Sequence, residues 1–416
     1  MQSRKRAPSE GNAYAVTRLI ASLVLMTIGN GGMYAATVVL PLVQAEFGIA
    51  RSEASLPYTL TMIGFGLGGI LMGRLSDRFG VMVPVILGAF FLCIGFVAAG
   101  FAPNILTFAL AHGILIGFFG CAASFAPLIA DVSQWFTKRR GVAVAIVITG
   151  NYTAGAIWPV ALQSYFSSMG WRATYIAAGI FCLATMLPLA MFLRRSPPAA
   201  TEGEGVDRSK LISARPLGFS PAALQAILVV AGLACCVAMS MPLVHIVAYC
   251  SDLGFPAARG AEMLALMLGC GIASRLASGW IADRIGALRT LLIGSTLQGV
   301  ALLLFLPFDG LASLYVVSAL FGFFQSGIVP MYAIIVRDYF VPSEAGTRVG
   351  IVMMATLLGM ALGGWMSGAV FDLTGSYKAA FLNGTAWNLL NVAIAVWLLY
   401  RHNRLHGLQP AILKPA

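Results

Sequence analysis

The sequence predicts an all-α membrane protein, with twelve transmembrane helices in two pseudo-symmetric six-helix bundles. The chain is 59% hydrophobic and only 10% charged, whereas soluble globular proteins are about 25% charged. It contains twelve apolar stretches of about the 20 residues that a helix needs to cross a bilayer. Its two halves also resemble each other, as set out below.

The twelve stretches are uniformly apolar, without the alternation that marks the strands of a membrane β-barrel. The first follows a basic leader, MQSRKRAPSE, which lacks a cleavable signal pattern. Their expected limits are 17–45, 54–75, 81–101, 104–134, 141–166, 171–193, 218–250, 258–281, 287–307, 311–338, 346–371 and 377–400.

The basic residues predict the topology. With an even number of spans and a cytoplasmic N-terminus, 21 of the 26 Lys and Arg residues lie on the cytoplasmic side. Arg275 falls within a span, and the outer side receives only Arg51, Arg172, Arg259 and Lys378. This asymmetry predicts both termini in the cytoplasm. We expect the protein to lie in the plasma (inner cell) membrane. It also explains the net charge of +11 without a nucleic-acid partner.

One polar segment divides the chain. Residues 194–217 are rich in Pro, Gly, Ser and charge, which is typical of a linker. We therefore expect an N-terminal six-helix bundle over 1–193, a cytoplasmic linker over 194–217 and a C-terminal six-helix bundle over 218–416.

The two halves contain matching segments at a nearly constant offset. GRLSDRFG at 73–80 matches GWIADRIG at 279–286, and GFFG at 117–120 matches GFFQ at 322–325. GWRATYIAAG at 170 onwards likewise matches GSYKAAFLNG at 375 onwards. Four matches in the same order, counting the aromatic-Phe pairs that follow the fourth and tenth spans, predict a parallel duplication of the kind found in transporters.

The repeated G-x-x-x-D-R-x-G loop resembles the signature loop of the major facilitator superfamily, between its second and third spans. The resemblance covers essentially the whole chain. It implies alternating access, in which pairs between helix ends break as the halves rock. The residues expected to take part in gating are Asp77, Arg78, Asp283 and Arg284 in the loops, with Asp131 and Arg140 at other cytoplasmic helix ends.

A second motif, WFTKRRGVAVAIVITGNYTAG at 135–155, resembles the entry to the fifth helix of the monocarboxylate porters. Arg275 also matches an arginine of the eighth helix that binds the substrate carboxylate in that group. Two features differ: the first span lacks a lysine, and Gly271 stands where an acidic residue is common. The Gly-Pro-Gly-Gly pattern of drug/proton antiporters is absent from the fifth span.

Arg275 lies eight residues before Asp283, about 12 Å along a helix from the signature loop. A charge at such depth costs about 2.5–3.5 kcal/mol on insertion scales, so an interaction must offset it. We expect Arg275 to bind an anionic substrate. The alternatives are an arginine that snorkels to the interface and one that pairs with an acid of another helix.

His245 in the seventh span is the expected site of proton coupling and a candidate substrate ligand, because the unperturbed pKa of a histidine lies near working pH. A histidine bonded to a neighbouring backbone is the alternative, and His112 presents the same choice. Further candidate substrate ligands are the polar span residues Asn30, Tyr34, Asn151, Tyr152 and Tyr332. For each of these, bonding between helices is the competing interpretation.

These features indicate a secondary transporter for a small organic anion, in particular a monocarboxylate. The subfamily resemblance implies proton symport by a monomer embedded in the bilayer. An exporter of lipophilic compounds and an organic anion exchanger remain alternatives. We expect no enzymatic activity, no cofactor and no metal site, because no catalytic constellation or ligand spacing is present among the cysteines, histidines and acids.

Overall fold

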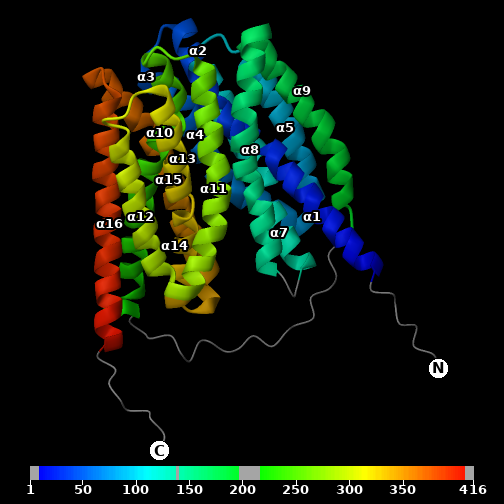
Figure 1. Ribbon diagram of the computed structural model, residues 1–416. Helices are drawn as coiled ribbons and strands as arrows, with labels where there is room; N and C mark the ends of the chain where they lie inside the picture. The colour runs from blue at the N-terminus through cyan, green and yellow to red at the C-terminus, as the bar shows by residue number, and fades with distance from the viewer. Residues whose placement is uncertain (1–8, 137–139, 196–215, 408–416) are drawn as a thin grey trace, which may run out of the picture. The chain divides into compact units, whose positions relative to one another are not determined.

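A computed structural model describes residues 9–136, 140–195 and 216–407. These residues form helices and no strand (Figure 1). Twelve helical segments are long and apolar enough to cross a membrane, and their limits lie within five residues of those expected. The predicted twelve-span, all-α fold is therefore confirmed.

The described chain packs as two compact units. The first comprises the chain up to Phe47 and again from Leu60 through the sixth span. The second comprises Gly48–Thr59 and the described chain from Pro216 onwards. Gly48–Thr59 thus packs in the second unit, although it precedes the second span. Most of the expected linker lies outside the described residues. We call the helix ends near Gly48 and Gly254 outer, and those near Gly80 and Gly286 inner.

The first unit holds the first six spans. Its elements are α1 (Ser9–Gly29), α2 (Gly31–Phe47), most of α4 (Leu56–Phe79), α5 (Met82–Gly100), α6 (Ile105–Leu110), η1 (Ala111–Gly120), η2 (Cys121–Ser124), α7 (Ala126–Trp135), α8 (Arg140–Met169), α9 (Trp171–Ala190) and η3 (Met191–Leu193).

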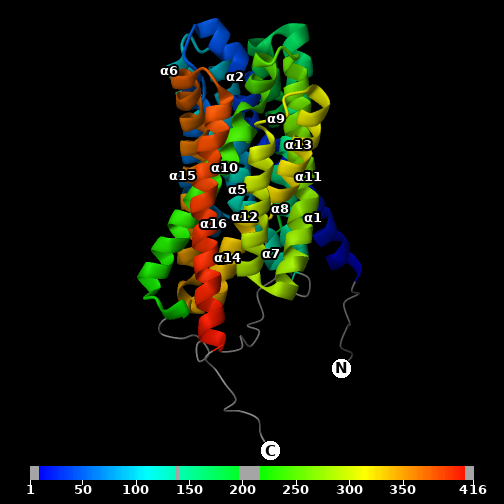
Figure 2. The ribbon, with the colours of Figure 1, turned by 60° about the vertical axis from the view of Figure 1, so that its left-hand side comes forward.

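The second unit holds the last six spans, and Figures 1 and 2 show its long helices running alongside one another. Its elements are α3 (Arg51–Ala54), η5 (Pro216–Gly218), α10 (Pro221–Asp252), α11 (Ala257–Ile285), α12 (Ala287–Leu304), α13 (Leu311–Gln325), α14 (Ile328–Tyr339), α15 (Pro342–Thr374) and α16 (Tyr377–Gly407).

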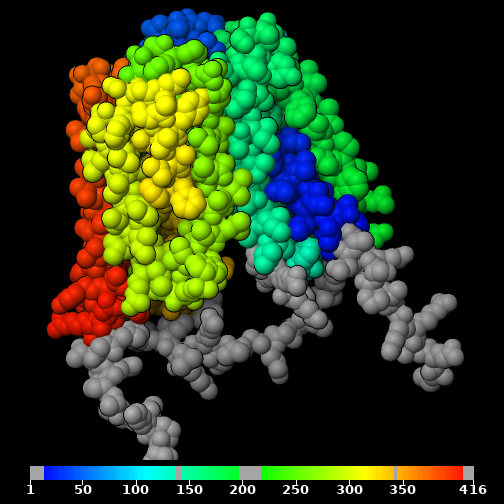
Figure 3. All heavy atoms as spheres, viewed as in Figure 1, coloured from blue at the N-terminus to red at the C-terminus, as the bar shows by residue number. Residues whose placement is uncertain are grey.

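Large apolar side chains are exposed along the helices. In the face of the second unit shown in Figure 3, the surface is formed largely by α11, α12 and α13. These helices expose Leu276, Trp280, Ile293 and Val316. Exposed apolar surface of this extent is unfavourable in water, and it fits an integral protein whose solvent is lipid.

Three spans predicted as single apolar runs are interrupted. The first breaks at Asn30, between α1 and α2. The fourth passes through a π-helix, η1, and then a 3₁₀ turn, η2. The tenth breaks between Gln325 and Ile328. The fourth and tenth spans occupy the same place in the two repeats, so the duplication extends to the position of the breaks.

The break in the first span is stabilised by a tryptophan. The Trp158 ring packs directly on Gly31, where no side chain has room. Its Nε1 donates a hydrogen bond of 3.0 Å to the carbonyl oxygen of Thr27 in α1. An indole thus supplies a donor to the last turn of the interrupted helix, as backbone in a bilayer requires.

Glycines set the closest helix contacts. At Gly322 of α13, any Cβ would overlap the backbone of Met267 in α11. At Gly269 on α11, by contrast, nothing lies within 4 Å of a built Cβ. The approach of α11 and α13 therefore depends on Gly322, as small-residue packing between membrane helices does in general.

We expect Gly322→Val to lower the melting temperature of the purified protein, because overpacking costs typically about 1–3 kcal/mol. Gly269→Val adds the same side chain to an open position and serves as the control. Thermal unfolding in detergent compares the two. Equal shifts for both variants would contradict a special role for the Gly322 contact.

Candidate functional site

Arg275 lies on α11, ten residues before the helix ends at Ile285, and its side chain is half-buried. Its neighbours on the helix are small. Ser274 is buried and Ser278 is half-buried, one residue before and three residues after the arginine. A permanent cation thus stands well inside a membrane span, next to small side chains of its own helix.

The break in the tenth span lies against this part of α11. A Cβ at Gly327 would overlap the Oγ of Ser278, and the carbonyl oxygen of Ser274 is 3.5 Å away. Gly327 therefore seats the broken turn on the two serines that flank Arg275. In transporters, interrupted helices at matching positions of two repeats often mark the substrate-binding site. The turn between Gln325 and Ile328 is therefore a candidate part of that site.

Gln325 ends α13 at the break, and its side chain is fully buried. Neither its Oε1 nor its Nε2 has a hydrogen-bond partner among the described residues. A buried amide without partners is rare, because losing its hydration costs about 1–3 kcal/mol. As a polar residue of the apolar tenth span, Gln325 is also a candidate from the sequence to line the substrate cavity.

Tyr332 of α14 is fully buried in a polar network. Its hydroxyl donates to Asn391 Oδ1 at 2.7 Å, and Asn391 Nδ2 donates to Ser295 Oγ at 2.8 Å. The network joins α14, α16 and α12. In this structure the Tyr332 hydroxyl therefore forms a hydrogen bond between helices. Its predicted role in substrate binding stays a prediction.

His245 of α10 is also fully buried, at the outer end of the second unit. Its Nε2 lies 2.8 Å from the carbonyl oxygen of Gly364, and its Nδ1 lies 3.0 Å from the hydroxyl of Tyr377. These partners fit a neutral imidazole that donates through Nε2 and accepts at Nδ1.

The structure does not bring His245 and Arg275 to the same depth. Counted from the outer ends of α10 and α11, they lie seven and 18 residues along their helices. At 1.5 Å per residue, this separates them by about 16 Å along the helix direction. The two residues are therefore attached to the second unit at different depths.

The candidates of the first unit lie in the first and fifth spans, and two of them meet. Tyr34 OH donates to Asn151 Oδ1 at 3.4 Å. Asn30, at the break, donates through Nδ2 to the carbonyl oxygen of Met26 at 2.9 Å. Its Oδ1 has no partner among the described residues. Tyr152 is buried in α8.

The other histidine candidate, His112, lies in the π-helix η1 and is fully buried. Its Nε2 is 3.2 Å from the hydroxyl of Tyr175. Its ring also packs against Phe108, with centroids 4.7 Å apart. The aromatic surroundings suit a side chain that packs the core of the first unit.

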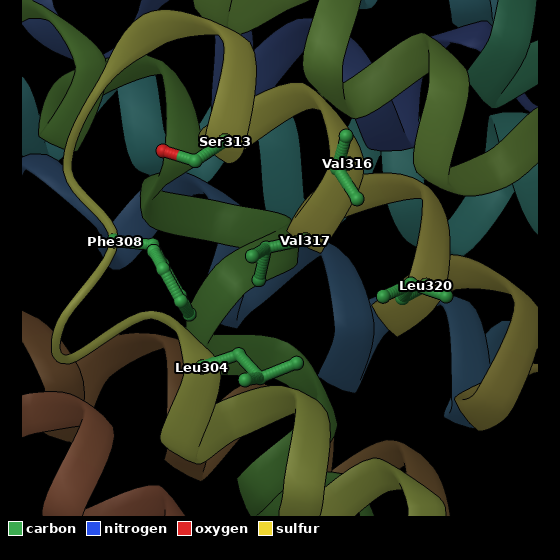
Figure 4. Close-up of a pocket in the computed structure, with 6 residues that line it drawn as sticks. All are labelled: Leu304, Phe308, Ser313, Val316, Val317 and Leu320. Atoms are coloured by element: carbon green, nitrogen blue, oxygen red, sulfur yellow. The ribbon is translucent and has the colours of Figure 1, made fainter.

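One cavity of about 320 Å³ lies at the outer end of α12 and α13 (Figure 4). It is lined by apolar side chains and one hydroxyl, Ser313, with Phe308 and Val316 largely exposed. A cavity without a cation or several donors cannot select an organic anion, so we do not place the substrate there.

Comparison with known proteins decides the family. The sequence profile of the Major Facilitator Superfamily matches residues 20–285 and 260–414. The chain belongs to this superfamily. Its relatives include monocarboxylate transporter 13 of Rattus norvegicus, 27% identical over 353 residues, which cover 83% of this chain and 78% of that protein. Monocarboxylate transporter 11 of Homo sapiens is 29% identical over 323 residues, 74% and 66% of the two chains.

Another relative is named for export. The aspyridones efflux protein of Emericella nidulans is 28% identical over 325 residues, 77% of this chain and 63% of that protein. Among solved structures, an inward-facing, occupied bacterial homologue of the human lysosomal transporter Spinster matches with a TM-score of 0.67 and 16% identity. It covers 97% of this chain and 99% of that one, which shows the fold.

The Major Facilitator Superfamily signature loops adopt equivalent turns. Gly80 and Gly286 have φ of +80° and +86°, a conformation that only glycine adopts without strain. Asp77 and Asp283 are exposed and form no ion pair among the described residues. The neighbouring Arg78 and Arg284 guanidinium groups lie over the rings of Phe79 and Trp280, at 5.2 and 3.7 Å.

Asp131, predicted to act in gating, is instead found in a buried pair with Arg18. Arg18 donates through Nε and Nη2 to the two carboxylate oxygens, at 2.7 and 2.6 Å. Its Nη1 donates to the carbonyl oxygen of Arg195 at 2.9 Å, and the Trp135 ring lies 4.7 Å away. Arg140 begins α8, but its side chain lies outside the described part of the chain. Gating by these residues stays a prediction.

The Arg18–Asp131 pair should contribute strongly to stability. Asp131→Ala leaves a guanidinium buried without its carboxylate, which costs about 3–5 kcal/mol. We therefore expect a large fall in melting temperature. Glu344→Ala is the control, because it removes an exposed pair with Arg348 worth about 0.3–0.5 kcal/mol. A small shift for Asp131→Ala would mean that water reaches the pair.

Two buried glutamines of the second unit should respond in opposite directions. Gln325→Leu removes an amide without protein partners, so we expect an unchanged or higher melting temperature. Gln298→Leu removes an amide whose Nε2 donates to the carbonyl oxygen of Cys235, so we expect a fall of about 1–3 kcal/mol in stability. If Gln325→Leu destabilises as much as Gln298→Leu, a bound water or another group satisfies Gln325.

Proposed function

We propose that this major facilitator transporter moves a small organic anion, in particular a monocarboxylate, by alternating access coupled to protons. The observation that carries the proposal is Arg275, a half-buried guanidinium inside a membrane span. A guanidinium recognises a carboxylate through two parallel hydrogen bonds, and both are strong where water is scarce. The relatives named monocarboxylate transporters support the same substrate class.

The surroundings of Arg275 favour a small ligand. Ser278 lies three residues after Arg275 on the same helix, and the interrupted tenth span packs against its Oγ at Gly327. A lipophilic cation would meet a like charge at the same place, which opposes binding.

Proton coupling requires a group that carries the proton. The two candidates are His245 and the substrate itself. His245 can take a proton only by giving up its hydrogen bond from Tyr377 OH at Nδ1. The substrate itself can instead bind as an anion and move with a proton. The depth difference between His245 and Arg275 favours the second route. We further propose a monomer in the plasma membrane with both termini in the cytoplasm.

Export of lipophilic compounds is the second candidate, because relatives of similar identity include an efflux protein. The two functions differ in what stabilises the purified transporter. Organic anions should do so in the first case, and neutral or cationic lipophilic compounds in the second.

We expect a monocarboxylate such as lactate or pyruvate to raise the melting temperature of the purified transporter by mass action. Arg275→Gln should abolish this shift and uptake into proteoliposomes driven by a pH gradient. Arg259→Gln is the matched control, because Arg259 starts the same helix and pairs at the exposed surface with Glu262. It should leave both readouts unchanged.

Two results would contradict the anion proposal. One is a monocarboxylate shift that persists in Arg275→Gln. The other is stabilisation by lipophilic cations alone, which would favour export. Loss of folding in Arg275→Gln without ligand would assign the charge to structure, and Arg275→Lys would then separate charge from geometry.

A further inference from the structure

Each unit carries an arginine stacked on an aromatic ring at the inner end of its last span. In the first unit the Arg195 guanidinium lies 4.7 Å from the centre of the Tyr14 ring. In the second, the Arg401 guanidinium lies 4.5 Å from the centre of the Phe219 ring. The two rings are 205 residues apart in the sequence and the two arginines 206, so both pairs occupy equivalent positions of the duplication.

In the first unit the stacked arginine belongs to a cluster that contains an acid. Arg18 donates through Nη1 to the Tyr14 hydroxyl at 3.3 Å and to the carbonyl oxygen of Arg195 at 2.9 Å. The same guanidinium binds both carboxylate oxygens of Asp131. The inner end of the first unit thus supplies its own anion.

The second unit keeps the stacked pair without this acid. Ala223 stands at the position equivalent to Arg18. Residues 335–337, IVR, span the position equivalent to Asp131. The hydrogen bonds that join the first cluster to a carboxylate therefore have no counterpart among the described residues around Arg401.

The helices that carry the second pair add no acid of their own. Neither the chain over 216–251, which includes Phe219, nor the chain over 373–407, which includes Arg401, contains an aspartate or glutamate. Arg404 brings a second cation three residues after Arg401. Charge on these two elements is therefore unbalanced at the inner end, which favours an anionic partner.

The acids of neighbouring elements already stand beside other arginines. At the inner end of the described second unit, Asp283 is next to Arg284 and Asp338 is next to Arg337 in the sequence. Glu344 pairs with Arg348 at 2.7 Å. Arg401 and Arg404 differ from these cations in having no acid beside them in the sequence.

One exposed stripe of α16 leads to Arg404. Leu382, Leu389, Val396 and Tyr400 are between 49% and 61% exposed, and their spacing of seven, seven and four residues places them on one face of the helix. Figures 1 and 2 show α16 at the edge of the second unit. The change from aliphatic residues to a tyrosine and then an arginine marks the level at which a helix leaves the hydrocarbon.

Aromatic rings hold Arg401 at this level. Its guanidinium lies 5.9 Å from the centre of the Trp397 ring, in addition to its contact with Phe219. The two rings meet edge to face with centroids 5.0 Å apart. Stacking fixes the plane of a guanidinium and leaves the N–H groups at its edge available for a ligand.

We propose that Phe219, Trp397, Tyr400, Arg401 and Arg404 form a basic–aromatic patch that binds the phosphate group of an anionic phospholipid. A guanidinium can bind a phosphate through two parallel hydrogen bonds. Basic residues at a membrane surface attract anionic headgroups, and exposed tryptophan and tyrosine suit that level of the bilayer. A lipid also brings acyl chains, which can pack along the aliphatic stripe of α16. The site goes beyond the proposed function and does not depend on Arg275.

A lipid titration tests the patch. The full chain, purified in detergent, is titrated with phosphatidylglycerol, with phosphatidylcholine of the same acyl chains, or with inorganic phosphate, and its melting temperature is recorded. We expect phosphatidylglycerol to raise the melting temperature more than phosphatidylcholine, and inorganic phosphate to leave it unchanged. Arg401→Gln combined with Arg404→Gln should weaken the apparent affinity for phosphatidylglycerol about 30-fold, which corresponds to about 2 kcal/mol for two arginines.

Two further variants separate a site from general attraction to positive charge. Arg289→Gln combined with Arg337→Gln removes two exposed cations from the same end of the second unit and should leave the affinity nearly unchanged. Phe219→Leu keeps every charge but removes the ring on which Arg401 stacks, so it should weaken the binding of phosphatidylglycerol.

Three results would overturn the proposal. Equal stabilisation by the two phospholipids would mean that the patch does not select an anionic headgroup. Equal losses in the two paired variants would show attraction to surface charge alone. Stabilisation by inorganic phosphate that Arg401→Gln with Arg404→Gln abolishes would assign the patch to a soluble anion.

Phe219→Leu keeps the test decisive if the paired Arg401 and Arg404 variant fails to fold, because unchanged affinity in Phe219→Leu also contradicts the patch. None of these readouts uses a monocarboxylate. Failure of the anion-transport proposal therefore leaves this test intact, and failure of the lipid site leaves the transport proposal intact.

Discussion

A membrane span has no water with which to satisfy its polar atoms, and this constraint explains most of what distinguishes the structure from twelve plain helices. Where the first span breaks, an indole nitrogen of Trp158 bonds the carbonyl oxygen of Thr27. Where Tyr332 is buried, Asn391 and Ser295 complete a chain of hydrogen bonds. The departures from this rule are informative for the same reason. Gln325 is buried without a protein partner at a break in the tenth span, beside the helix that carries Arg275.

The number, type and limits of the spans could be predicted because they depend on composition and length alone, which are local properties. The breaks could not, because their causes come from distant residues. The glycines around Asn30 are compatible with a continuous helix, so the local sequence does not indicate a break. Trp158, which packs on Gly31 at the break, is more than a hundred residues away in the sequence. The site residues divide in the same way. Polar side chains in spans could be found, but whether each faces a ligand or a neighbouring helix depends on the partner helix. Tyr34 and Asn151 meet, whereas His245 and Arg275 lie at different depths.

The sequence alone indicates only that Arg18 and Arg51 are charges that help to set the topology. Their partners, Asp131 and Asp252, are more than a hundred residues away in the sequence. The duplication offers a comparison for Arg51. At the outer end of the first repeat, Glu46, Trp171 and Arg172 bind one another, and the second repeat has Asp252, Tyr377 and Lys378 at the equivalent positions. In the second repeat, Lys378 is left at the surface and Arg51 supplies the charge. A lysine is a flexible point charge, whereas a guanidinium can bind the acid and the tyrosine hydroxyl at once. The substitution of one cation for another is therefore also a change in geometry.

The two buried arginines, Arg18 and Arg51, bind acids that differ in their exposure to water. Arg18 holds both oxygens of Asp131 at 2.6 and 2.7 Å, and both side chains are shielded from water. Separating them would leave two charges in a medium that cannot hydrate them. Arg51 divides its donors between Tyr377 and an aspartate at 3.1 Å whose side chain is one-third exposed. Water reaches the Asp252 carboxylate in part, whereas Asp131 is shielded from it. Breaking a shielded pair leaves an unhydrated charge, so losing the Arg18 contact should cost more stability than losing the contact between Arg51 and Asp252.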